Sequence, residues 1–281
     1  RLCGLIGNPV EHTLSPLIHN TLAEKMGHNL AYLPFCVQEQ YIKQAVEGAF
    51  GLNVLGMNVT VPHKSAVIPY LTEIDPVAEE IGAVNTLVRR ENGFAGYNTD
   101  MPGLFRAMQS DGVKLEGESV LILGAGGAAR AVAFLCASKG AKEIFLLNRS
   151  LGKALEVAAE VNALYGEKVF AMELSSYQEL PKWRYLAIQC TSVGLYPNND
   201  AAVIEEESFY RMIHTGYDLI YRPEETKFMK LVKQAGGKAY NGLKMLLYQG
   251  IIAYELWNEV SITEEVAEEI LELLKEKVAV S

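Results

Sequence analysis

The sequence predicts an α/β protein of two domains, the first of which contains a mixed sheet. Three observations support this prediction. Strand-like and helix-like segments alternate along most of the 281 residues, a glycine-rich turn joins a strand to a helix near the middle, and a hairpin signal interrupts the alternation near residue 92. Such alternation is typical of sheets built from right-handed βαβ units. The length fits one large or two medium domains.

The first part of the chain alternates short apolar strands with helical segments. Ser15, Pro16 and Gly27 predict one helix, as its N-cap, first residue and closing residue. Asn92-Gly93 between two alternating segments predicts a tight hairpin. The expected strands are residues 2–6, 30–36, 54–59, 86–90 and 94–97, and the expected helices are residues 15–27, 41–50, 63–71 and a segment after Asp75-Pro76.

The second part of the chain is more regular, and a helix over 101–109 with the polar loop 111–118 marks the expected boundary. After Lys238 the pattern becomes helical. The expected strands are residues 119–123, 143–147, 168–172, 185–190 and 216–220, and the expected helices are an alanine-rich segment that ends near Lys139 and residues 151–165, 243–258 and 263–277.

The composition excludes several classes of partner. Lys and Arg number 25 against 34 Asp and Glu, a net charge of −9, so we expect no basic face for nucleic acid. The longest apolar runs are too short to span a bilayer. The four cysteines lie far apart without a CxxC pair, so we expect inert thiols rather than disulfides or a metal site. With no signal-peptide pattern before the first strand, we expect a cytoplasmic protein.

The glycine-rich turn has the form G-x-G-x-x-A, with Gly124, Gly126 and Ala129 at its small positions. Gly124 allows a tight strand-to-helix turn, and Gly126 lets the backbone approach a pyrophosphate at the helix N-terminus. Ala129 is small enough for the helix to pack on the sheet. This setting predicts a Rossmann-like dinucleotide-binding domain, and the alternative is a packing turn in an unrelated α/β fold.

The end of the next strand indicates which dinucleotide is bound. An NAD site usually has Asp or Glu there for the ribose hydroxyl. This chain has Asn148-Arg149-Ser150 instead, followed by Lys153. Two cations in place of an acid favour the 2′-phosphate of NADP. A solvated basic helix start is the alternative.

Polar side chains gather at the end of the strand over 54–59. Asn58 and Thr60 face the same way, and Pro62 redirects the chain before Lys64. Taken alone, a lysine after a proline is most often an exposed helix residue, so Lys64 by itself indicates no function.

Two other polar stretches lie in the same part of the chain. Thr13 and Ser15 present two hydroxyls on one side, and Asn85-Thr86 is followed downstream by Asn98-Thr99-Asp100. An Asp before a helix is usually an N-cap, so Asp100 alone carries no specific function.

These motifs, with Cys190-Thr191-Ser192-Val193-Gly194 and Tyr248-Gln249-Gly250, follow one another as in the shikimate dehydrogenase family, which the chain resembles over nearly its whole length. The resemblance implies a shikimate 5-dehydrogenase, an NADP-dependent oxidoreductase that reversibly reduces 3-dehydroshikimate to shikimate in aromatic amino acid (chorismate) biosynthesis. It implies a substrate domain of residues 1–100, completed by C-terminal helices within 238–281, and an NADP-binding Rossmann domain of residues 101–237. It also implies a small-molecule substrate, no nucleic acid or membrane partner, and a monomer or homodimer.

The resemblance also assigns roles to single residues. Lys64 matches the family's catalytic acid/base and Asp100 matches its partner. The residues that match substrate contacts are Thr13, Ser15, Asn58, Thr60, Asn85, Asp100, Gln249 and Tyr221, the last of which would lie between the two ligands. The residues that match cofactor contacts are Gly124, Ala125, Gly126, Gly127, Ala128, Ala129, Asn148, Arg149, Lys153, Thr191, Leu219 and Gly242.

Two residues depart from the family's usual pattern. Thr13 replaces a common Ser, which bears on substrate choice, and Lys153 replaces a common Arg, which bears on the strength of the NADP preference. The alternative function is a quinate/shikimate dehydrogenase with relaxed substrate and cofactor use. A non-catalytic nucleotide sensor on the same fold would be expected to lack Lys64 or Asp100, and both are present. Burial would favour a neutral Lys64 and a neighbouring carboxylate the ammonium form, so its protonation state stays open.

Overall fold

The computed structural model describes residues 1–182, 184–195 and 198–280, which divide into two compact units. Unit 1 combines residues 1–107 with residues 244–277, and unit 2 comprises residues 108–243 and the last few residues from 278 on. The units therefore divide a few residues after the expected boundaries at 100 and 237. Unit 1 is made from two separate stretches of chain, and unit 2 is inserted between them.

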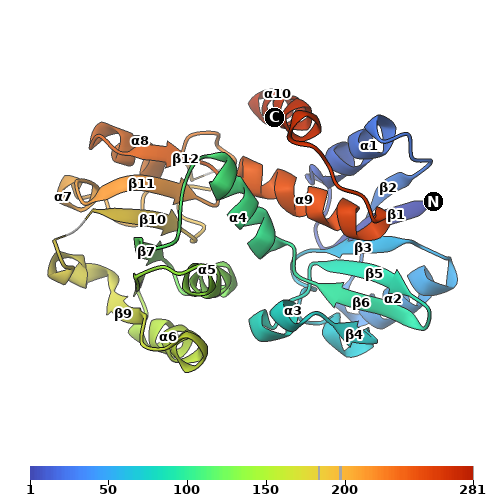
Figure 1. Cartoon of the computed structure of the whole chain (residues 1–281), viewed down its shortest axis with the longest axis horizontal. Helices are drawn as coiled ribbons and strands as arrows, with labels where there is room; N and C mark the ends of the chain where they lie inside the picture. The colour runs from blue at the N-terminus through green and yellow to red at the C-terminus, as the bar shows by residue number, and fades with distance from the viewer. Residues whose placement is uncertain (183, 196–197, 281) are drawn as a thin grey trace. The chain divides into compact units, whose positions relative to one another are not determined.

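The sheet of unit 1 is mixed, as the sequence predicts. Its six strands follow the order β2-β1-β3-β5-β6-β4 (Figure 1). β1 pairs in parallel with β2 and β3, β5 pairs antiparallel with β3 and β6, and β4 pairs in parallel with β6. The bounds are β1 Leu2–Gly7, β2 Ala31–Cys36, β3 Gly56–Val59, β4 Glu73–Ile74, β5 Thr86–Arg90 and β6 Gly93–Tyr97. The antiparallel pair β5–β6 is the expected hairpin.

Three helices of unit 1 carry candidate site residues: Ser15–Lys25, Asp100–Ser110 and Leu243–Asn258. α1 begins at Ser15 with Pro16 in its first turn, but its N-cap is Leu14, so the expected Ser15 cap is wrong by one residue. The described helices here are α1 Ser15–Lys25, α2 Ile42–Gly51, α3 Pro76–Ile81, α4 Asp100–Ser110, α9 Leu243–Asn258 and α10 Glu264–Val280, with short 3₁₀ segments at Glu39–Tyr41 and Ile68–Tyr70; α4, α9 and α10 each run past a unit boundary.

The helix expected over residues 63–71 is not formed. Turns occupy most of this segment, and only Ile68–Tyr70 is helical, as a 3₁₀ segment. Its last amides bond three residues back, as from Tyr70 to the Val67 carbonyl at 3.0 Å. Pro69 has no N–H to donate and so cannot extend an α-helix. The segment that carries Lys64 is therefore a compact turn.

The sheet of unit 2 is entirely parallel, with the order β12-β11-β10-β7-β8-β9. When these six strands are numbered 1 to 6 along the chain and read across the sheet from β9 to β12, their order is 3-2-1-4-5-6. This is the strand order of a Rossmann fold, and it confirms the expected fold class. The bounds are β7 Ser119–Leu123, β8 Glu143–Asn148, β9 Val169–Glu173, β10 Tyr185–Gln189, β11 Ile213–Asp218 and β12 Lys238–Tyr240. The order reverses between β7 and β10, where such folds bind ligands.

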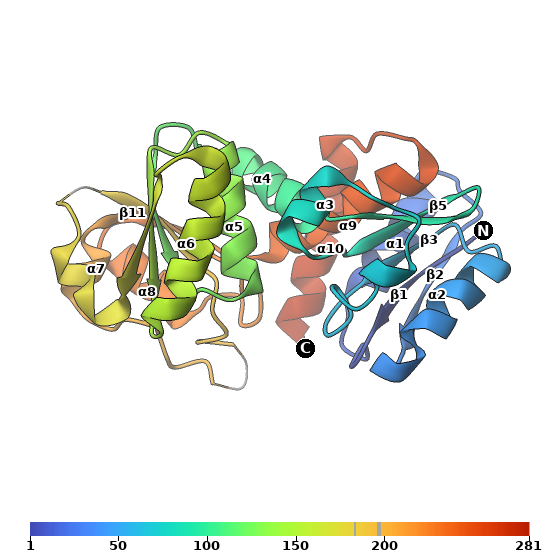
Figure 2. The same cartoon turned by 90° about the horizontal axis from the view of Figure 1, so that it is seen from below.

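The helices of unit 2 cover its sheet. α5 and α6 lie side by side and pack on β7, β8 and β9 (Figure 2). The helices are α5 Gly127–Ser138, α6 Leu151–Tyr165, α7 Glu207–Tyr210 and α8 Lys227–Gln234, with a 3₁₀ segment at Leu174–Glu179. The sequence did not predict β12, α7 or α8, and it expected β11 three residues later.

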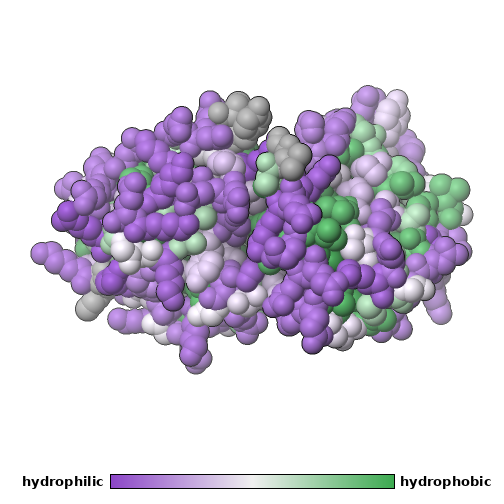
Figure 3. Space-filling model, turned by 90° about the horizontal axis from the view of Figure 1, so that it is seen from above, coloured by the Kyte–Doolittle hydropathy of each residue, from purple (hydrophilic) through white to green (hydrophobic). Residues whose placement is uncertain are grey.

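Apolar side chains fill the core of each unit. Ile6, Met57 and Leu87 are among those buried in unit 1, and Leu121, Leu147 and Ala187 among those buried in unit 2. On the face drawn in Figure 3, hydrophilic residues predominate and hydrophobic ones are scattered. Across the described part of the chain, no helix is both long and apolar enough to cross a membrane.

Candidate functional site

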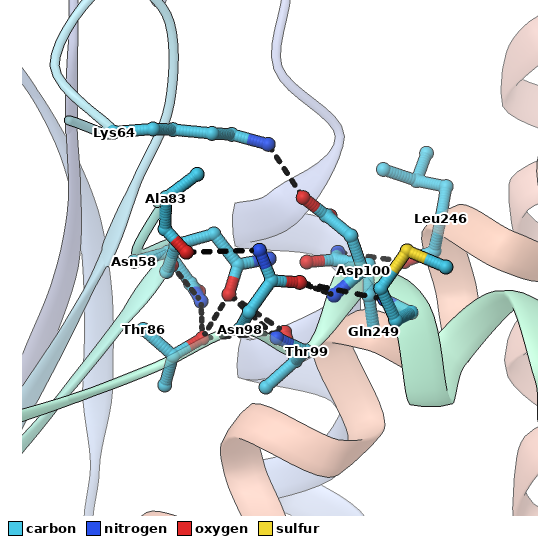
Figure 4. Close-up of polar contacts among 11 residues, drawn as sticks. Asn58, Lys64, Ala83, Thr86, Asn98, Thr99, Asp100, Leu246 and Gln249 are labelled. Carbon is cyan, nitrogen blue, oxygen red and sulfur yellow. Dashed lines mark hydrogen bonds and ion pairs between the residues drawn. The ribbon is translucent and has the colours of Figure 1, made fainter. Parts of the chain in front are cut away.

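Lys64 and Asp100 form an ion pair in unit 1. Lys64 Nζ lies 2.6 Å from Asp100 Oδ2, and the two side chains point toward one another (Figure 4). Lys64 belongs to the turn after β3, and Asp100 is the first residue of α4. The side chains are 32% and 23% exposed, so solvent screens the pair and it contributes little to stability. Both groups are therefore accessible from solvent.

Asn98, not Asp100, caps α4. Its Oδ1 accepts hydrogen bonds from the backbone N–H groups of Asp100 at 3.1 Å and Met101 at 3.4 Å. Its Nδ2 donates to the Ala83 carbonyl at 3.0 Å, which ties the cap to the segment before β5. The interpretation of Asp100 as an N-cap is therefore wrong. Because Asn98 satisfies the helix end, the Asp100 carboxylate can bond Lys64.

Asn58 and Asn85 lie close together in one buried hydrogen-bond network. Asn58 is 5% exposed and Asn85 is 3% exposed. Asn58 Nδ2 donates to the Asn85 carbonyl at 3.3 Å and to Thr86 Oγ1 at 3.1 Å. The network also includes Thr99, whose backbone N–H donates to Asn85 Oδ1 at 2.8 Å. Neither Thr86 nor Thr99 was predicted as a site residue, although each follows an asparagine in a repeated Asn-Thr pair that could have indicated it.

Thr13 and Ser15 place their hydroxyls together, as the sequence predicts. Thr13 Oγ1 donates to Ser15 Oγ at 3.1 Å and accepts from the Ser15 backbone N–H at 3.2 Å. Thr60 is half-buried at the end of β3, where its backbone N–H bonds the Ile6 carbonyl.

Gln249 lies on α9, which packs closely on α4. A Cβ at Gly103 would lie 2.7 Å from the Gln249 backbone nitrogen, so glycine permits this approach. Gln249 Nε2 donates to the Leu246 carbonyl at 2.8 Å. Within the described residues, no hydrogen bond joins Thr13, Ser15, Thr60 or Gln249 to the Lys64–Asp100 pair. The roles of these four as substrate contacts stay predictions, as do those of Asn58 and Asn85.

The glycine turn of unit 2 has the backbone that a dinucleotide requires. Gly124 has φ +112°, a conformation that favours glycine, and Gly126 is the exposed N-cap of α5. Gly127 and Ala128 are also exposed, Ala125 is half-buried, and Ala129 is fully buried against the sheet. The first amides of α5 therefore face solvent, where an anion can bind them.

Arg149 and Lys153 follow β8 and are both exposed. Within residues 1–182, 184–195 and 198–280, neither side chain has a hydrogen bond or ion pair. Asn148 precedes them and donates from Nδ2 to the Ser150 carbonyl at 3.0 Å, which shapes the turn into α6. Two exposed cations without partners can bind a phosphate without breaking an internal contact.

The remaining cofactor candidates lie on loops held by Asp218. Its Oδ1 accepts from the Ile220 backbone N–H at 3.0 Å and its Oδ2 from Thr226 Oγ1 at 2.6 Å. Gln189 Nε2 donates to Asp218 Oδ1 at 3.4 Å, and Gln189 Oε1 accepts from the Thr191 backbone N–H at 2.5 Å. Burial raises the pKa of Asp218 to about 6, against the hydrogen bonds that lower it.

Leu219, Gly242 and Tyr221 lie beside this network. A Cβ at Gly242 would collide with the Leu219 carbonyl, so the two backbones approach closely because residue 242 is glycine. Tyr221 is half-buried, and burial raises its pKa above the usual range. These backbones, the turn of α5 and the exposed cations fit an NADP molecule. Gly124 to Ala129 would hold its pyrophosphate, and Arg149 and Lys153 its 2′-phosphate.

Comparisons with known proteins agree with both units. Residues 5–87 match the family described as the shikimate dehydrogenase substrate binding domain, and residues 106–201 match shikimate / quinate 5-dehydrogenase. A protein of Desulforamulus reducens named shikimate dehydrogenase (NADP(+)) is 39% identical over 96% of this chain and 94% of its own. A protein of the same name from Carboxydothermus hydrogenoformans is 40% identical, over 93% of this chain and 92% of its own length. The solved shikimate 5-dehydrogenase of Thermus thermophilus, in complex with NADP(H) and shikimate, is 31% identical with a TM-score of 0.83, and the match covers 96% of this chain and 98% of that one.

Proposed function

Because the chain belongs to the shikimate dehydrogenase family, we propose that it catalyses the reversible NADPH-dependent reduction of 3-dehydroshikimate to shikimate. This is the reaction of an oxidoreductase that acts on a CH–OH group, and it serves aromatic amino acid (chorismate) biosynthesis. The observation that carries the proposal is the Lys64–Asp100 pair, two partly exposed groups 2.6 Å apart that can transfer and hold a proton. When bound, NADPH would supply the hydride for the reduction, and NADP⁺ would accept it in the reverse direction.

Lys64 is the acid in the direction of reduction. Its ammonium group donates a proton to the oxygen of the ring carbonyl as that oxygen gains charge, and in the reverse direction the amine accepts the proton. Asp100 holds the lysine side chain in place through the 2.6 Å contact. Asn98 fixes the backbone of Asp100, so the pair is oriented before a ligand arrives.

The polar side chains of unit 1 bind the substrate in this proposal. Asn58, Thr60 and Asn85 contact ring hydroxyls, because amides and hydroxyls satisfy such groups better than charged side chains. Thr13 and Ser15 donate hydrogen bonds to the carboxylate. Gln249 supplies a further amide, and Tyr221 is a further candidate substrate contact.

Unit 2 holds the cofactor in this proposal. The exposed amides at the start of α5 bind the pyrophosphate, and Arg149 and Lys153 bind the 2′-phosphate. Asn148, Thr191, Leu219 and Gly242 contact the rest of the dinucleotide. The buried bonds of Asp218 support this by holding the loops after β10 and β11.

The names of the relatives do not favour a quinate/shikimate dehydrogenase with relaxed specificity, since curated relatives carry the name shikimate dehydrogenase (NADP(+)). Initial rates with shikimate or quinate, each with NADP or NAD, test the proposal directly. We expect shikimate with NADP to be the fastest pair by at least tenfold. Equal rates with quinate or with NAD would support the relaxed enzyme, and no activity with any pair would refute the proposal.

The setting of the enzyme is part of the proposal. Cys3, Cys36, Cys136 and Cys190 are all free, which supports a reducing compartment such as the cytoplasm. Burial raises the pKa of Cys3 and of Cys136 to about 12, so these thiols are inert. We expect a monomer or homodimer, which sedimentation of the purified protein would establish.

A further inference from the structure

Five buried polar residues of unit 1 form a continuous set of hydrogen bonds, here called the asparagine network: Tyr32, Asn58, Asn85, Thr86 and Thr99. Figure 4 labels Asn58, Thr86 and Thr99 of this network. The proposed reaction uses only the two asparagines. Tyr32, Thr86 and Thr99 are at most 1% exposed, so their hydroxyls are out of reach of solvent. Buried hydroxyls are kept where they satisfy other polar groups, and here those groups are the two asparagines.

Backbone partners identify which atom of each amide is the nitrogen and which is the oxygen. Asn58 faces the Asn85 carbonyl at 3.3 Å, and because a carbonyl can only accept, the Asn58 atom there is Nδ2. Asn85 faces the Thr99 backbone N–H at 2.8 Å, and because an N–H can only donate, the Asn85 atom there is Oδ1. Neither assignment depends on the direction of a hydroxyl.

Thr86 is the residue that joins the two amides. Its Oγ1 accepts from Asn58 Nδ2 at 3.1 Å and donates to Asn85 Oδ1 at 3.0 Å. The Thr99 hydroxyl lies 3.2 Å from both Thr86 Oγ1 and Asn85 Oδ1. At the other end, the Tyr32 hydroxyl donates to Asn58 Oδ1 at 2.8 Å, and the His19 ring stacks on Tyr32 with centroids 4.2 Å apart. A single hydroxyl, that of Thr86, thus bonds both asparagines.

This arrangement leaves one polar atom of Asn85 for a ligand. Its Oδ1 already meets three donors, whereas its Nδ2 has no hydrogen-bond partner among the described residues. Nδ2 is also not among the fully buried polar atoms that lack a partner, so it reaches solvent. Asn85 can therefore offer an N–H donor to an incoming oxygen, but not an acceptor.

We propose that Thr86 is a positioning residue, whose hydroxyl holds the amides of Asn58 and Asn85 in one orientation so that Asn85 presents its N–H group to a substrate oxygen. The inference rests on the proposed function, because it takes the two asparagines as substrate contacts. Loss of the Thr86 hydroxyl would leave an Asn58 N–H without its acceptor and remove a donor from Asn85 Oδ1. Each amide would keep its backbone partner but lose one of the bonds that hold it, so both would be held less tightly.

The test replaces Thr86 by an isosteric residue without a hydroxyl. Thr86→Val should raise the KM and the calorimetric Kd for shikimate by roughly tenfold, while the KM for NADP stays within about twofold. Thr86→Ser, which keeps the hydroxyl, should return both shikimate constants to within about threefold of the original. Thr72→Val makes the same replacement at an exposed threonine of unit 1, and it should leave these constants unchanged. Within the described residues, the Thr72 hydroxyl bonds only the Phe94 carbonyl.

A double-mutant cycle separates positioning from general damage. If Thr86 acts through Asn85, then Thr86→Val should cost less than about twofold in kcat/KM for shikimate when Asn85→Ala is already present. An undiminished cost in that background, or a failure of Thr86→Ser to restore binding, would overturn the proposal. If Thr86→Val does not fold, Thr86→Ala replaces it in the same cycle.

The outcomes also distinguish this proposal from the proposed function. An unmodified protein that neither binds nor oxidises shikimate refutes the proposed function, whatever the variants do. An active protein whose shikimate constants are unchanged by Thr86→Val refutes the positioning role alone.

Discussion

The two units prepare their candidate ligand sites in opposite ways. In unit 1 the side chains hold one another in place, as the partly exposed Lys64 and Asp100 do directly and the buried Asn58 and Asn85 do through Thr86. In unit 2 the site consists of an open backbone turn and the exposed cations Arg149 and Lys153, which have no partner in the described chain. Side chains that must orient a reacting group are fixed in advance, whereas groups that only attract a phosphate are left free.

The largest expected effect on activity is that of replacing Lys64, the proposed proton donor of unit 1. Lys64→Ala should lower kcat by about 10²–10⁴, the usual range for loss of a general acid, while NADP binding measured by fluorescence titration stays near normal. Lys43→Ala, which removes an exposed lysine of α2, is the matched control. A loss in kcat of less than tenfold would make Lys64 a binding residue and would weaken the contrast between the units.

Unit 2 also buries a charged group, Asp218, and a pH experiment measures how that burial affects stability. Asp218 is fully buried in unit 2, and burial raises its pKa from 3.8 to about 6. Its contribution to stability is therefore fully present below about pH 4 and is lost as the pH rises through 6. Between pH 4 and 7, the free energy of unfolding should fall by about 3 kcal/mol more in the original protein than in Asp218→Asn. Urea unfolding at several pH values measures this, and parallel curves for the two proteins would contradict it.

The cation pair of unit 2 should give a smaller effect, confined to one ligand. A charge-assisted contact contributes about 1.5–3 kcal/mol, and because Arg149 is exposed we expect the lower end. Arg149→Ala should thus raise the KM for NADP roughly tenfold and leave the KM for NAD almost unchanged. Lys139→Ala, at the C-cap of α5, controls for loss of a positive charge in the same unit. If NADP binding survives Arg149→Ala intact, the 2′-phosphate is bound elsewhere.

The smallest expected effect concerns Thr13, and it tests how strongly unit 1 discriminates between two similar substrates. Threonine keeps the hydroxyl of serine but adds a methyl group on a stiff side chain. Quinate has an extra hydroxyl on the carbon that carries the carboxylate, so this methyl should crowd quinate more than shikimate. Thr13→Ser should therefore raise the ratio of kcat/KM for quinate to that for shikimate by a factor of roughly 5–10, near the lower limit for one methyl-sized change. An unchanged ratio would show that the methyl group does not contact the ligand.

Regular elements with strong local signals were predicted well from the sequence. The strand β7, the helix α6 and the helix α9 have the expected bounds, because their apolar periodicity is long and clearly ended. The short edge strand β12 was missed, since three residues carry no periodicity and only pairing with β11 defines them.

The sequence predicted which residues belong to the candidate site better than it predicted the contacts between them. Motif order led to Lys64 and Asp100, and the structure places them 2.6 Å apart. The role of Asn98 as a cap rests on local bonds to the backbone of Asp100 and Met101, so it was predictable and was missed. The role of Thr86 as a link was not predictable, because it depends on Asn58, which is distant in the sequence. Local pattern identifies a polar residue, but only tertiary structure shows which partner it satisfies.

The discontinuity of unit 1 also determines the order in which the protein can mature during synthesis. Residues 108–243 of unit 2 leave the ribosome before residues 244–277, which unit 1 needs for its final packing. Until α9 is made, the sheet of unit 1 lacks Trp257, whose indole N–H bonds the Leu87 carbonyl at 2.9 Å and whose ring fills the space beside Gly56. The half of the molecule that begins first is therefore completed last, and the nascent chain carries an unfinished apolar surface while the inserted unit folds.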